Sequence, residues 1–345
     1  MHKEMIAALR ASTYHFFMNG EKISFMITED KDIVVQVCII EAMVRELISK
    51  NDIVFTKKRL KISRHEVINY SDLGKKFLHC LKFDRARIKE FYPMHEFSPN
   101  FEKFFSAQEN HEKNFPRILG GYFADQVDDY IKSLNESVEF IRLETKKDEF
   151  KYKKASFNRL PNENFLGLNK YIDNLLKKYH HLLVLRIDFG YKKRDQFLQS
   201  DFFEIDYSEV SEHRLMLMRY IKEKLPEKSI EGFAWKLQHS LNTSYQYSFM
   251  LFSKLDAIDE GESEKIVKLI GTYWNEKITG GRGFYYDGKN FPSGFKRFGI
   301  GINNYGDEVA RAELKKAAFY LTKRDDYLRL LVPENGRSFS KGQLL

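Results

Sequence analysis

Residues 181–189 constrain the fold of this chain more than any other segment. They read His-Leu-Leu-Val-Leu-Arg-Ile-Asp-Phe, a short apolar run rich in branched side chains. A run of this length is far too short to span a membrane and is typical of a strand buried inside a sheet. Two further strands are predicted at residues 232–238 and 244–252, with a turn around Asn242 between them. The second half of the chain is therefore expected to contain a sheet.

Helices and shorter strands are predicted around these three strands. Apolar side chains recur at helical spacing in residues 208–224, 262–277 and 307–323. The last of these helices starts at Asp307, a residue type that commonly caps helix N-termini. Two more short strands are expected at residues 283–287 and 298–302. The resulting order resembles an elaborated ferredoxin-like antiparallel sheet with helices on one face, so we predict the α+β class. Many unrelated functions use such a sheet.

The first half of the chain is expected to be mainly helical. Helical spacing predicts helices over residues 32–47, 72–90 and 122–143. In the third of these, the apolar stripe that we expect in the core comprises Phe123, Val127, Ile131, Leu134, Val138 and Ile141. Residues 158–164, which include Pro161, are expected to form a connector. We therefore predict a helical N-terminal domain over residues 1–165 and a sheet domain over residues 166–345.

Composition narrows the class of protein. The chain has 345 residues, of which 43% are hydrophobic, so it is long enough for two domains with a core each. Its net charge of +8 favours an anionic partner, of which nucleic acid is the usual one, although a solvated basic surface would have the same composition. Cys38 and Cys80 lie in apolar runs without CxxC spacing and are expected to be buried thiols in a reducing compartment.

Neither a secretory leader pattern nor a membrane-spanning run is evident in the sequence. The protein is therefore expected to be cytoplasmic and to have no membrane partner. Patterns of Ser/His/Asp, Cys/His or HExxH catalysis do not stand out, and histidine pairs at zinc-ligand spacing are missing. The chemistry of the chain is consequently sought in its predicted sheet.

Several segments of the second half carry a resemblance to a known family. They are residues 183–188 (LVLRID), 234–238 (AWKLQ), 244–252 (SYQYSFMLF), Trp274, 317–323 (AAFYLTK) and 336–341 (GRSFSK). Their order and spacing resemble those of the inovirus-type gene-two replication protein family, also known as the YagK/YfjJ family, over roughly residues 170–345. The family's members look like HUH-type rolling-circle initiators. The resemblance implies a DNA-binding replication-initiator-like protein of a phage, prophage or satellite element.

The resemblance also implies a metal site with unusual ligands. In HUH enzymes two histidines at positions i and i+2 of a central strand face the same side and hold one divalent cation, which polarises the scissile phosphate. Those positions align here with Gln246 and Ser248, and a carboxylate position on the preceding strand aligns with Gln238. Neutral groups bind Mg²⁺ or Mn²⁺ feebly, so either ion is expected only if the protein is active. Alternatively, the three side chains hydrogen-bond across an inert sheet.

A tyrosine and a lysine on the last predicted helix are the candidate catalytic pair. In HUH enzymes a tyrosine attacks the scissile phosphorus and becomes linked to the 5′ end of the DNA. Tyr320 and Lys323 are spaced at i and i+3 and share a helix face, where the ammonium would stabilise a phenolate and attract phosphate. The alternative is an ordinary aromatic and basic residue near a helix C-terminus. Tyr327 is a second choice of nucleophile.

Basic residues around the predicted sheet are candidate DNA contacts. They are Arg186, Arg282, Lys289, Lys296, Arg297 and Arg337, several of them in a glycine-rich and aromatic setting. An exposed β-hairpin is the alternative interpretation of residues 280–290. Arg186 and Asp188 share a strand face and could hold a phosphate or a metal, or form a structural ion pair. A palm-type polymerase or primase would also need a second strand with carboxylates, which is not evident.

Three functions therefore stay open. An active initiator would cut a single-stranded or hairpin origin through Tyr320. A catalytically inactive protein of the same fold would bind DNA without cutting it. A regulatory or interaction protein would have lost DNA binding as well, and its N-terminal domain would be the place for a protein partner.

Overall fold

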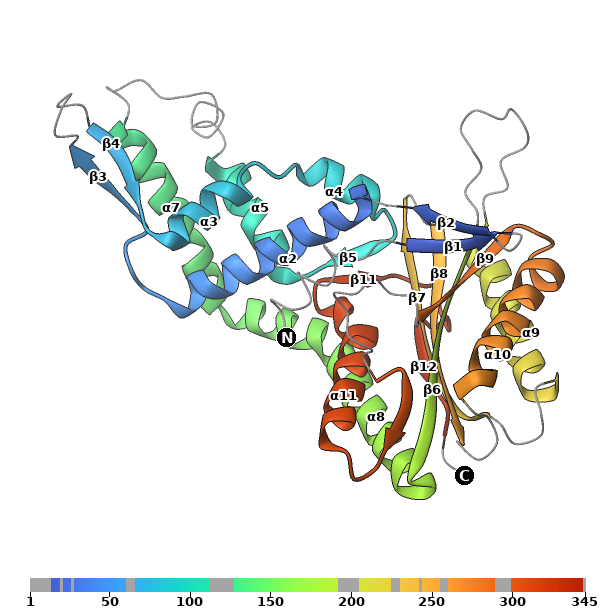
Figure 1. Ribbon diagram of the computed structural model, residues 1–345. Coiled ribbons are helices and arrows are strands. Elements are labelled where there is room, and N and C mark those ends of the chain that lie inside the picture. Colours follow the sequence, from blue (N-terminus) through green and yellow to red (C-terminus); the bar gives the residue numbers. More distant parts are fainter. Residues whose placement is uncertain are drawn as a thin grey trace, which may run out of the picture.

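The computed structural model describes residues 14–18, 21–25, 28–59, 66–111, 127–191, 205–224, 230–241, 244–254, 260–288 and 299–343. Helices and antiparallel strands are both abundant, so the predicted α+β class is confirmed. Figure 1 shows a large sheet with helices on both of its sides and a mainly helical region that extends away from it.

The large sheet is built from the second half of the chain. Its strands are β6 (His181–Tyr191), β7 (Ile230–Ser240), β8 (Ser244–Lys254), β9 (Gly283–Asp287), β10 (Gly301–Asn304) and β12 (Phe339–Lys341). The order is β10-β6-β8-β7-β12. β10 and β9 lie along the same edge of β6: β10 pairs with residues 181–184 and β9 pairs with residues 187–191. Every pairing is antiparallel. The first four predicted strands are confirmed, the fifth begins at Gly301 rather than residue 298, and β12 was not predicted.

Helices cover both faces of this sheet (Figure 1). They are α8 (Asp148–Tyr179), α9 (Tyr207–Lys224), α10 (Glu260–Tyr273, extended by the π-helical turn Trp274–Ile278) and α11 (Glu308–Thr322). α9 and α10 pack on one face, and α8 and α11 pack on the other. The prediction of helices on one face is therefore wrong. The reason lies in β6, where Leu183 and Leu185 enter one core while Leu182 and Val184 enter the other, so both faces are apolar and need a cover.

The first half of the chain forms helices with short strands between them. The helices are α2 (Thr28–Ser49), α3 (Asp72–Cys80), α4 (Arg85–Phe91), α5 (Pro99–His111) and α7 (Val127–Lys146), and the strands are β1 (Tyr14–Met18), β2 (Glu21–Phe25), β3 (Phe55–Arg59), β4 (Glu66–Tyr70) and β5 (His95–Phe97). The helix predicted over residues 72–90 is interrupted, because the side chain of Asp84 accepts hydrogen bonds from the next backbone N–H groups and starts α4 anew. Most of the predicted apolar stripe of α7 is buried as expected, and Phe123 lies outside the described residues.

The expected connector at residues 158–164 is also wrong, because α8 runs through it without a break. Pro161 is buried inside this helix together with Phe157 and Leu168, so packing of the buried face outweighs the hydrogen bond that proline removes. The same helix passes through residue 165, where the boundary between the two domains was expected.

Beyond α11, the 3₁₀ turn η5 (Lys323–Asp326) leads to β11 (Leu328–Leu330), which pairs with β5. Tyr327, between them, enters the core of the helical half.

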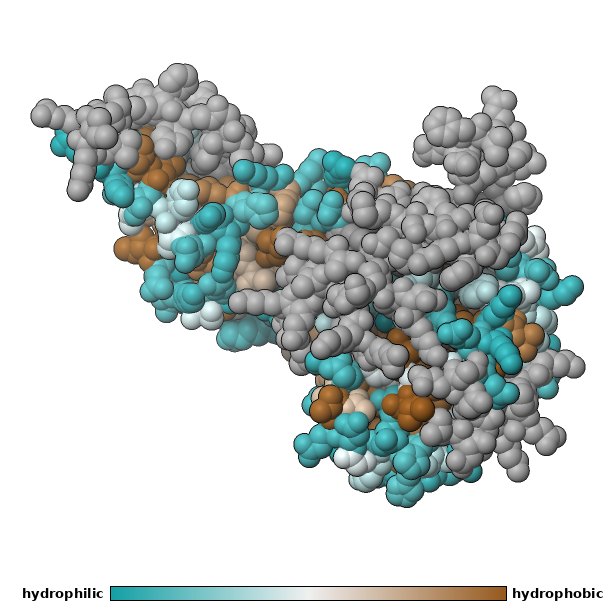
Figure 2. Space-filling view, in the orientation of Figure 1, coloured by the Kyte–Doolittle hydropathy of each residue, from teal (hydrophilic) through white to brown (hydrophobic). Residues whose placement is uncertain are grey.

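The exposed apolar side chains are scattered over the surface, and the two cysteines are buried. Exposed apolar side chains such as Ile53, Tyr152 and Val309 come from separate elements, and on the face seen in Figure 2 hydrophobic and hydrophilic areas interleave. None of the helices in the described ranges is both long enough and apolar enough to cross a membrane. Cys38 and Cys80 are buried, as predicted, and burial raises the pKa of each thiol to about 12.

Candidate nucleic-acid interface

A polar strip interrupts one apolar face of the sheet. It consists of Arg186 and Asp188 on β6, Lys236 and Gln238 on β7, and Gln246 and Ser248 on β8. The strand register places Gln238 directly opposite Gln246, and it places Ser248 between Asp188 and Lys236. The three residues predicted at the metal-ligand positions are therefore brought together on one face. Further along the same face the strands carry apolar residues, which α8 and α11 cover.

The charged members of the polar strip are already paired. Asp188 is almost fully buried, and its Oδ2 lies 3.4 Å from Nη2 of Arg186, so the predicted pair forms an ion pair in this structure. Lys236 is 1% exposed, and its ammonium donates to the carboxylate of Asp325 and, at 3.3 Å, to the hydroxyl of Ser338. An unpaired ammonium at such a buried place would be very costly, so Asp325 is the partner that allows Lys236 to be there.

The turn η5 also places a guanidinium on the polar strip. Nη1 of Arg324 donates to Oε1 of Gln238 over 2.8 Å, and Nη2 lies 3.4 Å from the hydroxyl of Tyr92. Both partners are neutral, and no carboxylate in the described part of the chain lies within ion-pair distance of this guanidinium. Arg324 is only partly buried. A guanidinium with neutral partners and spare N–H donors is a suitable group for binding phosphate.

The polar strip does not fit a divalent cation. Gln238 already accepts a hydrogen bond from Arg324, the carboxylate of Asp188 is engaged by Arg186, and the carboxylate of Asp325 is engaged by Lys236. Mg²⁺ and Mn²⁺ prefer several carboxylate oxygens, and the nearby cations would repel them. Over the ranges that the structure describes, no group of three His, Cys, Asp or Glu side chains is arranged to hold a metal ion.

The candidate catalytic pair is not arranged for nucleophilic attack in this structure. Tyr320 is half-buried against the core of the helical half. Lys323 is buried and donates to the carboxylate of Asp326 and to the side-chain oxygen of Asn162, and not to the phenol of Tyr320. Tyr327, the second choice, is 3% exposed, and burial raises the pKa of its phenol. Forming a phenolate there would be unfavourable.

The predicted DNA contacts have different surroundings. Arg282 forms an ion pair with Glu209 of α9, and Arg186 is paired as described above. Lys289, Lys296 and Arg297 lie outside the described residues. Arg337 is exposed and follows β11 in a segment that lines an open pocket of about 460 Å³. Of the predicted basic residues that the structure describes, Arg337 is thus the one most available to an anion.

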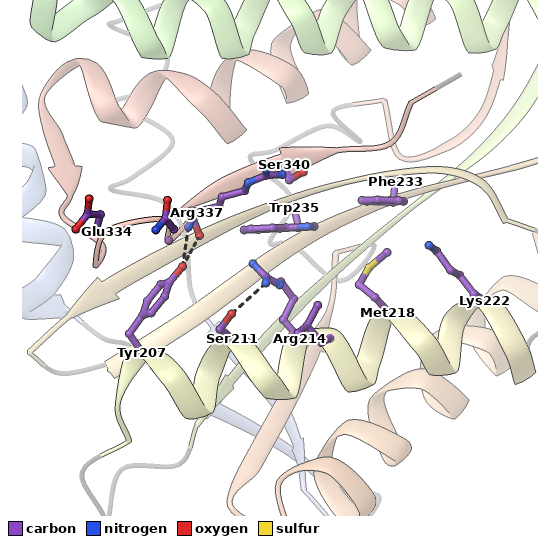
Figure 3. A pocket seen from close by; sticks show the side chains of 13 residues that line it. Tyr207, Ser211, Arg214, Met218, Lys222, Phe233, Trp235, Glu334, Arg337 and Ser340 are labelled. Carbon is purple, nitrogen blue, oxygen red and sulfur yellow. Dashed lines mark hydrogen bonds between the residues drawn. The ribbon is translucent and has the colours of Figure 1, made fainter. Parts of the chain in front are cut away.

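The pocket beside Arg337 contains residues that the sequence did not single out. We call it the α9 groove; it lies between α9, β7 and the segment from residue 334 to β12 (Figure 3). Arg214 and Lys222 of α9 and Trp235 of β7 line it, and the guanidinium carbon of Arg214 lies 4.4 Å from the centre of the Trp235 ring. A signal was present, because the two cations are eight residues apart on a predicted helix and so share one face.

A histidine beside the polar strip is expected to make stability pH-dependent. Burial, and then the positive charges of Arg324, His239 and Lys236, lower the pKa of His95 from 6.5 to about 2. Below pH 6.5 the unfolded chain binds a proton at His95 that the folded protein does not bind, so the free energy of unfolding falls as the pH falls. The loss between pH 8 and pH 5 is about 2 kcal/mol. His95→Gln should flatten this part of a urea-unfolding profile measured against pH. The exposed His79→Gln should leave the profile unchanged; an equal effect of both variants would contradict the assignment.

The two cationic features lie on opposite faces of one sheet. Lys236 and Gln238 of β7 face the polar strip, whereas Trp235 of the same strand faces the α9 groove. Comparison of the chain with protein-family models, with curated proteins and with solved structures found no match.

Proposed function

We propose that this chain is a DNA-binding protein of the replication-initiator type, from a phage or prophage element, that holds DNA phosphates without a metal ion and without cutting the strand. One observation carries the proposal: a guanidinium without a carboxylate partner among the described residues binds a side chain at one of the metal-ligand positions. Arg324 donates to Gln238 and keeps spare N–H donors, whereas the buried Lys236 is neutralised by Asp325. The Arg324 guanidinium can bind phosphate oxygens but cannot supply the chemistry of a metal ion.

The arrangement of the second half supports the initiator-type part of this proposal. We interpret its antiparallel sheet as an elaborated HUH-type, ferredoxin-like sheet. The positions aligned with the ligands of that family share one face, and the end of α11 leads into the turn that covers this face. The net charge of +8 favours the long-range attraction of DNA.

The surroundings of the tyrosines support the absence of cutting. Attack on a phosphodiester needs a phenolate and a group that stabilises charge on the phosphate. Lys323 is engaged by Asp326 and Asn162, and the pKa of Tyr327 is raised by burial. We therefore favour the catalytically inactive alternative over the active nuclease.

The proposal predicts salt-dependent DNA binding that needs no metal. A fluorescent single strand or hairpin should bind in EDTA as well as in Mn²⁺, and its affinity should fall steeply as the salt concentration rises. Arg324→Gln should weaken binding several-fold and reduce the salt slope by about 0.7–0.9, the value for one phosphate contact. The exposed Arg159, which is 3.9 Å from Glu163, provides the control Arg159→Gln, with little expected effect.

A covalent-adduct assay separates this proposal from its rivals. No protein–DNA adduct should form with labelled single-stranded DNA in Mg²⁺ or Mn²⁺. An adduct that forms with Mn²⁺ and disappears in Tyr320→Phe would show that the protein is a nuclease. Absence of salt-dependent affinity for any DNA would instead favour a regulatory or interaction protein.

A further inference from the structure

We infer that the α9 groove is the site where an unpaired stretch of DNA binds, with a base stacked beside Arg214 and Trp235 and with phosphates held by Lys222 and Arg337. The inference rests on the proposed function for the nature of its ligand. It adds a second binding surface, which lies on the face of the sheet opposite the polar strip.

The shape of the α9 groove suits an extended ligand. Figure 3 shows Arg214, Met218 and Lys222 rising from α9 toward the sheet, where Phe233 and Trp235 lie on β7. The volume of about 460 Å³ lies within the range of pockets that hold small organic ligands. It therefore has room for a nucleotide, while its open side lets a chain continue beyond it.

Among the described residues, the cations of the α9 groove have no counter-ion. Arg214, Lys222 and Arg337 have no carboxylate within ion-pair distance in the described ranges, although Glu334 is part of the same lining. By contrast, Arg282 at the other end of α9 is paired with Glu209. Three cations around one open groove repel each other, and an anionic ligand would remove that repulsion. The groove is therefore suited to phosphates.

The aromatic floor of the α9 groove favours unpaired bases. The Trp235 ring carries the Arg214 guanidinium on one side, and it meets the Tyr247 ring edge-on with the ring centres 5.6 Å apart. Base rings stack on indole rings and on guanidinium planes alike, so a base placed on Arg214 would extend an existing stack. Bases in a duplex are already stacked and paired, so they cannot occupy this position without being extruded.

The spacing of the cations favours a strand over a single phosphate group. Lys222 follows Arg214 by eight residues on α9, which corresponds to about 12 Å along the helix axis. Arg337 lies on the other wall, where its backbone N–H donates to the hydroxyl of Tyr207 over 2.6 Å, and its carbonyl accepts from that hydroxyl over 3.2 Å. These contacts hold the segment that carries Arg337 beside α9. Cations at this separation can contact different positions along one strand rather than a single phosphate group.

The test compares two double variants of the full-length chain with equal loss of charge. Arg214→Gln with Lys222→Gln should weaken binding of a fluorescent oligo-dT about 10- to 100-fold, measured by anisotropy. Lys265→Gln with Lys268→Gln removes two exposed cations of α10, on the same face of the sheet, and should change affinity less than twofold. Salt titration of each protein then counts the phosphate contacts, and the first variant should lose about one of them, that of Lys222.

Intrinsic fluorescence adds a second measurement at the groove itself. The chain has two tryptophans, of which Trp274 is fully buried in the core and Trp235 lines the α9 groove. Oligo-dT should change the emission of the wild-type protein and of Trp274→Phe. Trp235→Phe should abolish this change.

The outcomes distinguish the groove from the proposed function. If the wild-type protein binds DNA in a salt-dependent way and the two double variants bind equally well, the groove inference is wrong and the proposed function stands. Equal affinity for duplex and single strand would overturn the assignment to unpaired DNA. Competition by poly-glutamate as strong as that by oligo-dT would indicate an acidic peptide. If the wild-type protein binds no DNA, both proposals fail.

Discussion

Replacing Asp325 with asparagine is expected to lower the free energy of unfolding by about 3–5 kcal/mol, the usual cost of removing one partner of a buried ion pair. Lys236 is 1% exposed and Asp325 is 3% exposed. Without the carboxylate, the Lys236 ammonium keeps the hydrogen bond to the Ser338 hydroxyl, 3.3 Å away, but loses the anion that compensates its charge. Urea unfolding followed by far-ultraviolet circular dichroism measures the change as a shift of the midpoint.

Two further variants show whether burial causes this effect. Asp148→Asn removes an exposed carboxylate that pairs with Lys151, and it should change stability by less than about 1 kcal/mol. The double variant Lys236→Met with Asp325→Leu should recover most of the lost stability, since a buried ion pair can often be replaced by apolar side chains. A loss in Asp325→Asn no larger than in Asp148→Asn would show that Lys236 does not depend on this carboxylate.

Four strands of the large sheet, β6, β7, β8 and β9, could be predicted because each of them has a local signal, whereas the three-residue β12 has none. The branched apolar run of β6 and the period of two in β7 and β8 predict strands whatever surrounds them. The alternation also predicts that Gln246 and Ser248 share a face, which the register confirms. Lys236 could have been placed on that face by the same rule, because it precedes Gln238 by two residues on one strand.

Other features depend on contacts between distant residues, for which a single sequence carries no local signal. Arg324 reaches Gln238 across 86 residues of chain. Pro161 indicated a connector, yet its ring is buried in a continuous helix that packs against its neighbours. The apolar residues on both sides of β6 are visible in the sequence, and they require helices on both faces of the sheet.

Replacing Arg142 with methionine is expected to cost about 3–5 kcal/mol of stability, because three backbone carbonyls lose their donor. Arg142 of α7 is 4% exposed. Its Nε donates to the carbonyl of Leu47 over 3.2 Å, and its Nη2 donates to those of Lys50 and Asp52 over 2.7 and 2.9 Å. The guanidinium thereby satisfies the C-terminal end of α2 and the chain that follows it, where helix carbonyls have no partner within the helix.

Methionine keeps much of the volume of the Arg142 side chain, so the loss would come from the hydrogen bonds rather than from a cavity. Arg142→Lys should be intermediate, since one ammonium cannot reproduce the geometry of a guanidinium fork. Arg159→Met is the matched control on the exposed side of α8 and should stay within about 0.5 kcal/mol of the wild type. Chemical unfolding of the three variants measures these differences. Equal stabilities of Arg142→Met and Arg159→Met would contradict a capping role for Arg142.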